Sequence, residues 1–203
     1  MHKMRREEFN ETNMDKIKAV LSECEHGTLS LISEGEPYGV AVNFVFFEDK
    51  ICFHGAQEGR KVEAIKANPH ASFLVVKPYS IIPSYFSDTS LACPATQFFA
   101  SIHLYGNVAI VKDVDKKAKI LEAMMQKLQS EGGYDEVQSG NHMYAKMLEK
   151  LGVYILTPTT ISMKMKVGQN FSERKRLSLA NQLRERNNVG DGRTACMIES
   201  YIK

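Results

Sequence analysis

Hydrophobic and polar residues alternate along several short stretches of the chain. Residues 27–33 (GTLSLIS) and 38–47 (YGVAVNFVFF) are rich in β-branched and aromatic side chains, which is typical of strands. The polar residues EGEP between them predict a turn, and so a hairpin. The same reasoning predicts further strands over 51–55, 71–77, 96–111 and 153–166, with a bend or bulge at Gly106, and a short strand-like end over 195–202.

Other stretches repeat their apolar residues at helical spacing. The first is 13–25, where Thr12 or Asn13 can cap the helix. Residues 78–94 contain three prolines and no stable period, which predicts a long loop acting as a lid or an interface arm. The remaining predicted helices cover 60–68, 113–129, 141–152 and 172–187.

The order of these elements favours a mainly β fold with peripheral helices. Few strands are separated by full crossover helices, so a mostly antiparallel barrel fits better than a doubly wound parallel sheet. A length of 203 residues allows one domain with an appendage. The longest apolar runs are strand-sized and fall short of the roughly 20 residues that cross a bilayer, so we expect no membrane segment. The charged start of the chain predicts a cytoplasmic protein.

Charge and cysteine content exclude some function classes. A net charge of +2 is too small for a nucleic-acid footprint, and the cations of 172–187 are better explained as a solvated helix face. The four cysteines are widely spaced without a CxxC pair, and no histidine and carboxylate residues have metal-ligand spacing. We therefore expect reduced structural thiols, no metal and no nucleic-acid partner.

The stretch FHGAQEGRK, residues 53–61, is the candidate for chemistry. Gly55 and Ala56 end a strand with side chains too small to block a ligand. Gly59, Arg60 and Lys61 follow where a helix begins, and helix N-termini and arginine forks both suit phosphate. Two interpretations stay open on the residues alone, an ordinary basic turn and an anion site.

A longer pattern resembles a known family. The stretch PYGVAVNFVFFEDKICFHGAQEGRKVEAIKANPHASFLVV, the opening MRR, the hairpin GTLSLISEGEPYGVAVNF and the later FFASIHLYGNVAIV resemble the pyridoxamine 5′-phosphate oxidase-like, FMN-binding split-barrel proteins, most closely the nitroimidazole-resistance branch. The resemblance covers residues 4–165 and implies a homodimeric, six-stranded antiparallel split β-barrel with FMN at the subunit interface. We expect a barrel domain over 1–167 and a basic helical extension over 168–203.

The resemblance also implies which residues bind the cofactor. Gly59 stands where the oxidase has a serine, and SIHLYG replaces an arginine-containing strand, so oxidation of pyridoxamine phosphate is not expected. The implied roles are the flavin ring for Val40, Ala41, Val42, Asn43 and Ser101, the strand end at the cofactor for His54 and Gly55, and the phosphate for Arg60 and Lys61.

The function implied is an FMN-dependent oxidoreductase that reduces a small electron-poor substrate, such as a nitro compound, with a nicotinamide donor. His54 would be the catalytic proton donor, and Lys164 and Lys166 are candidate contacts to a second chain. One alternative is a non-catalytic flavin- or haem-binding protein, with His54, His103 or His142 as the axial ligand. Another is a structural dimer whose pocket stays empty.

Overall fold

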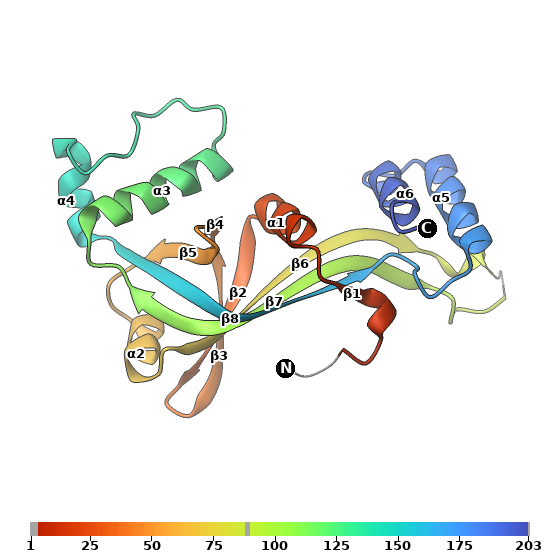
Figure 1. Ribbon diagram of the computed structural model, residues 1–203, viewed down its shortest axis with the longest axis horizontal. Coiled ribbons are helices and arrows are strands. Elements are labelled where there is room, and N and C mark those ends of the chain that lie inside the picture. The colour runs from red at the N-terminus through yellow and green to blue at the C-terminus, as the bar shows by residue number, and fades with distance from the viewer. Residues whose placement is uncertain (1–3, 88–89, 203) are drawn as a thin grey trace. The chain divides into compact units, whose positions relative to one another are not determined.

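The computed structural model describes residues 4–87 and 90–202 (Figure 1). Its helices are α1 (Met14–Glu23), α2 (Arg60–Ala67), α3 (Val114–Leu128), α4 (His142–Lys150), α5 (Glu173–Arg186) and α6 (Asp191–Glu199), with 3-10 turns η1 (Glu7–Phe9) and η2 (Ser84–Phe86). Its strands are β1 (Asn10–Glu11), β2 (His26–Ser33), β3 (Glu36–Asn43), β4 (Val45–Phe47), β5 (Lys50–Gly55), β6 (His70–Ile82), β7 (Thr96–Ile110) and β8 (Gly152–Lys166).

The strands form one sheet in the order β3-β2-β6-β7-β8-β5-β4, with β1 paired to β8. The hairpin β2–β3 is antiparallel, and so are the pairs β2–β6, β4–β5, β5–β8 and β1–β8. This confirms the predicted mainly β, antiparallel fold with peripheral helices. No helix within the described residues has the length and hydrophobicity needed to span a bilayer.

The sheet has eight strands instead of six because the stretch 38–47 divides and because β1 adds to β8. The division falls at Phe44, a fully buried residue whose ring meets that of Phe73 edge-on at 5.1 Å. The backbone N–H of Phe44 donates to Glu25 O and its carbonyl accepts from Lys127 Nζ at 2.8 Å. The backbone of Phe44 therefore bonds to groups outside the strand ladder, and β3 ends before it.

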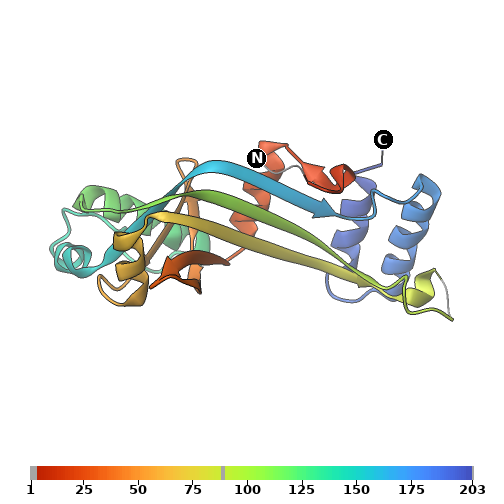
Figure 2. The same cartoon turned by 90° about the horizontal axis from the view of Figure 1, so that it is seen from below.

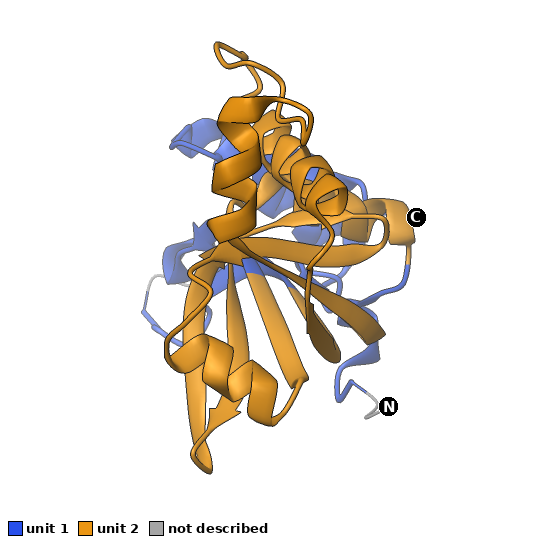
Figure 3. Cartoon of the chain, turned by 90° about the vertical axis from the view of Figure 1, so that its left-hand side faces the viewer, with its two compact units in different colours: residues 1–12, 76–101, 163–203 blue, residues 13–75, 102–162 orange. Residues whose placement is uncertain are grey.

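The chain packs as two compact units, shown in different colours in Figure 3. Unit 1 comprises 1–12, 76–101 and 163–203, and unit 2 comprises 13–75 and 102–162. The long strands β6, β7 and β8 each contribute residues to both units. The expected division of the chain after residue 167 stays a prediction, because the units group residues by packing rather than by chain order.

In unit 2 the amphipathic helix α3 packs on β4 and β5. Ile120 and Met124 on α3 are buried against Val45, Cys52 and Ile155 of the strands. Asp113 caps α3 by accepting a hydrogen bond from Lys116 N at 2.7 Å. At least one residue of the methionine-rich stretch 122–128 is thus core filling, as its helical spacing predicts.

The sequence-based loop over 78–94 was wrong in its first part. Strand β6 continues through Pro78 to Ile82, and η2 follows at Ser84–Phe86; residues 88–89 lie outside the described part. The pairs of β6 with β2 end at Leu74, so Pro78 stands where β2 requires no N–H from it. Strand β6 thus continues past Pro78, beyond the residues that pair with β2.

The strand-like interpretation of 195–202 was also wrong, because α6 covers Asp191–Glu199. Its buried residues are Asp191, Thr194, Ala195 and Ile198, which have the i, i+3, i+4, i+7 spacing of a helix face. Two of the four are polar, so an apolar period does not reveal them. In unit 1 this face packs against α5, and both helices appear in blue in Figure 2.

Candidate anion-binding site

Helix α2 begins with backbone donors that no side chain caps. Gly59 is its N-cap with φ of 98°, a left-handed conformation that favours glycine. The N–H groups of Val62 and Glu63 bond to Gly59 O at 2.8 and 3.1 Å, so the donors nearest the tip are those of Arg60 and Lys61. The tip also carries the positive end of the helix dipole, which attracts an anion.

The side chain of Arg60 is held in place by two contacts. Its Nε donates to the hydroxyl of Ser33 at 3.0 Å, and its guanidinium carbon lies 4.4 Å from the centre of the Tyr38 ring. Ser33 is buried at the end of β2. Among the described residues the bond to Ser33 is the guanidinium's one side-chain hydrogen bond. The two terminal nitrogens remain as a fork for a bound oxyanion.

Lys61 is a partly buried cation that lies against aromatic rings. Its ammonium is 5.0 Å from the centre of the Tyr154 ring and 5.6 Å from that of Phe53, and these two rings stack on each other. Burial lowers the pKa of Lys61. No carboxylate pairs with it within the described residues, so its charge is balanced only by the ring faces.

Gly55 makes room for this ammonium. A Cβ at Gly55 would come within 2.5 Å of Lys61 Nζ. The last residue of β5 must therefore be small for Lys61 to lie across the strand end. The sequence predicts that small residues at this strand end allow another group to approach closely. In the structure, the group that approaches Gly55 is the ammonium of Lys61.

His54 precedes Gly55 on β5 and is exposed. Partial burial of its ring, together with the positive charge of Lys61, lowers its pKa below 6.5. The imidazole is therefore mainly neutral at pH 7. Protonation of His54 becomes easier when an anion offsets the charge of Lys61, so its expected role as a proton donor depends on a bound anion.

The other expected cofactor residues lie on other strands. Val40, Ala41, Val42 and Asn43 end β3, which contacts β5 in unit 2. The side-chain amide of Asn43 donates to Glu25 O at 3.4 Å, so part of its polarity is already used. Ser101 is half-buried on β7 and belongs to unit 1. The structure thus gathers His54, Gly55, Arg60 and Lys61 at one place and leaves Ser101 in the other unit.

Four residues to which the sequence analysis gave no role in the site contact Arg60 or Lys61. Ser33 and Tyr38 orient Arg60, while Phe53 and Tyr154 support Lys61. Pairing of Phe53 with Tyr154 across β5 and β8 joins positions about a hundred residues apart in the chain. No spacing rule along one sequence connects such positions, although Phe53 stood within the quoted stretch.

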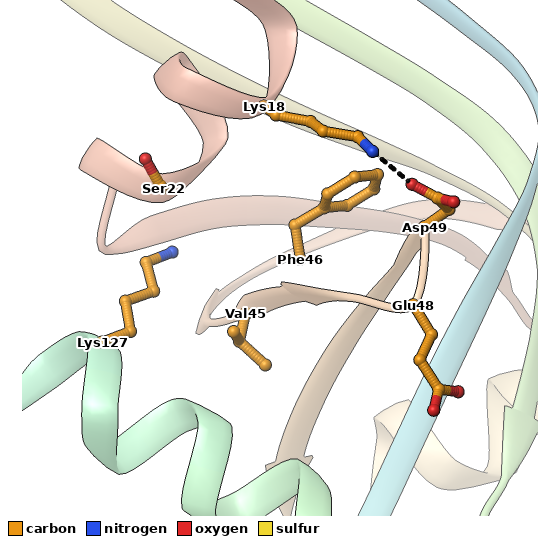
Figure 4. Close-up of a pocket in the computed structure, with 7 residues that line it drawn as sticks. All are labelled: Lys18, Ser22, Val45, Phe46, Glu48, Asp49 and Lys127. Carbon is orange, nitrogen blue, oxygen red and sulfur yellow. Dashed lines mark ion pairs between the residues drawn. The ribbon is translucent and has the colours of Figure 1, made fainter. Parts of the chain in front are cut away.

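A cleft of about 600 Å³ lies elsewhere in unit 2, between α1, α3 and the β4–β5 turn (Figure 4). Its two lysines pair with other groups of the protein. Lys18 Nζ is 2.9 Å from a carboxylate oxygen of Asp49. Lys127 donates to Leu21 O, Cys24 O and Phe44 O, and burial lowers its pKa to about 8. These lysines hold the cleft together and leave little charge for an anionic ligand.

Clusters of metal-ligating side chains are absent from the described part of the chain. No group of three histidine, cysteine, aspartate or glutamate residues there could hold an ion, and the four cysteines are free thiols. The fold and the site together define an antiparallel half-barrel with a candidate phosphate site.

Comparison with known proteins identifies the family. The model of the pyridoxamine 5′-phosphate oxidase family matches residues 13–165, so the chain belongs to this family. No curated protein sequence matches it significantly.

Solved structures with the same fold include three at low sequence identity. The flavocytochrome Anf3 of Azotobacter vinelandii is 20% identical, with a TM-score of 0.68, covering 86% of this chain and 77% of its own. An FAD and heme binding protein of Mycobacterium smegmatis is 17% identical, with a TM-score of 0.64 and coverages of 78% and 73%. A candidate 5-nitroimidazole antibiotic resistance protein of Bacteroides thetaiotaomicron is 16% identical, with a TM-score of 0.62 and coverages of 76% and 85%. At these identities the likeness is one of fold.

Proposed function

We propose that this chain is an FMN-binding oxidoreductase that reduces a small electron-poor substrate, such as a nitro compound, with electrons from a nicotinamide donor. The observation that carries the proposal is the cation Lys61, partly buried beside the uncapped start of α2 and without a carboxylate partner in the described residues. Family membership and the named flavin proteins of the same fold support a flavin as the ligand.

The residues present fit the phosphate end of FMN. Lys61 would supply one charge, the free nitrogens of Arg60 a second, and the first N–H groups of α2 further donors. Gly55 leaves room for the Lys61 ammonium at the strand end. The end of β3 from Val40 to Asn43 would line the ring.

Each partner in the proposed reaction has a separate task. Bound FMN would supply hydride and electron transfer. The chain would hold the phosphate, orient the ring and, through His54, deliver a proton to the reduced substrate. We also propose a homodimer in which the second chain completes each cofactor site.

FMN titration tests the proposal directly. Substitution of Arg60 and Lys61 together by alanine should lower FMN affinity by roughly 100-fold to 20,000-fold, because each of the two charge-assisted contacts contributes about 1.5–3 kcal/mol. Quenching of flavin fluorescence measures the affinity. Lys66→Ala is the matched control, because Lys66 lies on the same helix and pairs with Glu63.

The ligand series separates the phosphate role from general flavin binding. Riboflavin should bind the native protein weakly and be insensitive to the double substitution, whereas FMN should show the full loss. Native protein that binds no FMN contradicts the proposal. Equal FMN affinity in the native and doubly substituted proteins, with circular dichroism unchanged, moves the phosphate site elsewhere.

Haem binding is the second candidate function, and one contact favours it. The hydroxyl of Tyr105 lies 3.3 Å from His103 Nδ1 on β7. If Nδ1–H donates to that hydroxyl, Nε2 presents a lone pair, as in histidines that ligate metals. A Soret band on haem titration that His103→Ala removes would support this candidate. Absence of the band, with FMN bound, rejects it.

A further inference from the structure

A second positively charged pocket, of about 420 Å³, lies wholly within unit 1. Its wall comes from the segment before η1, from β7 and from β8. Strand β1 pairs with β8 through Asn10 and Lys164, which places β1 alongside the end of β8 (Figure 2). Its lining consists of Met4, Arg5, Arg6, Phe9, Phe99, Lys164 and Lys166, and we call it the basic pocket.

The alternation of β8 turns both lysines to the pocket. Met163, Met165 and Val167 are buried on the opposite face, which leaves Lys164 and Lys166 together on this one. Like-charged side chains two residues apart on one strand face repel each other unless an anion lies between them. The burial pattern of the strand thus forces a concentration of charge.

The cations of the basic pocket have aromatic and hydroxyl partners. Lys164 Nζ lies 5.4 Å from the centre of the Phe99 ring and 5.7 Å from that of Phe9. The guanidinium of Arg6 lies 5.8 Å from the Phe9 ring. Lys166 donates to the hydroxyl of Thr96. None of these contacts neutralises a charge.

No carboxylate stands among the described residues that line the pocket. Glu11, on the adjacent β1, directs its carboxylate to the hydroxyl of Tyr201 and to Thr12 N. Burial and the charges of Lys164 and Arg6 lower the pKa of Lys166. Four cations share one concave space, and in the absence of a ligand their mutual repulsion destabilises the folded protein.

We propose that the basic pocket binds a small organic phosphate with at least two negative charges, such as a nucleoside diphosphate, at a site separate from the start of α2. Two arginines offer bidentate forks to phosphate oxygens and two lysines add point charges. The volume is of the order found for small-molecule sites. A small enclosed group of cations suits a compact polyanion better than a nucleic-acid strand, which requires an extended basic surface.

Calorimetric titration with ADP, pyrophosphate and adenosine tests this proposal. ADP and pyrophosphate should bind, with affinity that falls as salt rises, and adenosine should not. Arg5→Gln and Lys164→Gln should each weaken ADP binding at least tenfold. Arg5 is exposed, so its substitution leaves the packing intact. Arg174→Gln removes an equal charge from an exposed position on α5 and should change nothing.

The α2 variant shows whether the two sites are separate. Lys61→Ala should leave ADP affinity at the basic pocket unchanged, and Arg5→Gln should leave FMN affinity unchanged. Absence of ADP and pyrophosphate binding overturns the proposal, as does ADP binding that Arg5→Gln and Lys164→Gln leave intact. Loss of ADP binding in Lys61→Ala overturns separateness, and tighter binding of a single-stranded oligonucleotide than of ADP overturns the ligand class.

Discussion

Asp191 in unit 1 and Lys61 in unit 2 are both charged groups held partly or fully out of water, and their surroundings differ. The carboxylate of Asp191 accepts two hydrogen bonds from Arg186, at 2.6 and 2.8 Å, and one from the hydroxyl of Ser80 at 2.6 Å. Lys61 has only ring faces beside it. The N–H of Asn188 donates a fourth hydrogen bond to Asp191, at 3.0 Å, so the carboxylate is fully paired, while the donors of Lys61 are left for a ligand.

We call Asp191 and its partners Arg186, Ser80 and Thr194 the matched cluster. It joins the C-terminal helices to β6. Arg186 ends α5, Asp191 begins α6, and Ser80 lies on β6, where its backbone N–H also donates to the hydroxyl of Thr194 at 3.0 Å. Arg186 further donates to Ile81 O. A charge that the fold satisfies stabilises the fold, whereas a charge that the fold leaves unsatisfied is available for binding.

The largest expected effect is on the matched cluster. Asp191→Ala leaves Arg186, Ser80 and the backbone N–H of Asn188 without this acceptor and should lower the free energy of unfolding by roughly 3–5 kcal/mol. Urea denaturation measures it. The exposed pair Arg184–Glu199 joins the same two helices, so Glu199→Ala should cost less than about 1 kcal/mol. An equal loss of unfolding free energy in both variants would show that the buried, fully hydrogen-bonded Asp191 contributes no more than the exposed ion pair of Glu199.

The pH dependence of the free energy of unfolding should reflect the lowered pKa of Asp191. Hydrogen bonds from Arg186 and then Ser80 lower the pKa of Asp191 to about 2. A folded pKa below the unfolded one means that the contribution is fully present above about pH 4 and is lost as pH falls toward 2. Thermal unfolding between pH 2 and 5 should show a steeper loss for the native chain than for Asp191→Asn. Parallel curves would assign the acid sensitivity to other carboxylates.

Removal of the unmatched charge should act in the opposite direction on stability. Lys61→Met keeps the contact with Phe53 and Tyr154 but removes a desolvated cation, so the free energy of unfolding should stay the same or rise by up to roughly 1 kcal/mol. FMN affinity should meanwhile fall at least tenfold. A loss of stability comparable with that of Asp191→Ala would show that Lys61 is a structural residue.

The smallest expected effect is on His54. Because the positive charge of Lys61 contributes to its lowered pKa, a bound phosphate should raise that pKa. Histidine NMR titration with and without FMN measures the change. FMN affinity should accordingly increase as pH falls through the pKa of His54. An unchanged pKa would separate His54 from the anion and remove the basis for its role in proton transfer.

Prediction from sequence worked best where a signal is local. The alternation of β2 and the capped amphipathic helices α1 and α3 follow from neighbours along the chain, and the structure confirms them. It failed at α6, whose buried face includes Asp191 and Thr194, because polar residues enter a core only when distant partners satisfy them. It also failed at Pro78, which lies within β6 beyond the residues that pair with β2.

The sequence by itself determined the family, the antiparallel fold and the stretch in which Gly55, Arg60 and Lys61 stand close together. Each of these conclusions follows from patterns among neighbouring residues along the chain. Only the tertiary structure decided which charges are matched. Ser33 reaches Arg60 because α2 packs on β2, and Tyr154 reaches Lys61 because β8 pairs with β5. Ser80 reaches Asp191 across 111 residues. Electrostatic balance depends on distances in space, so charge in a sequence becomes a bond or a binding site only when the chain has folded.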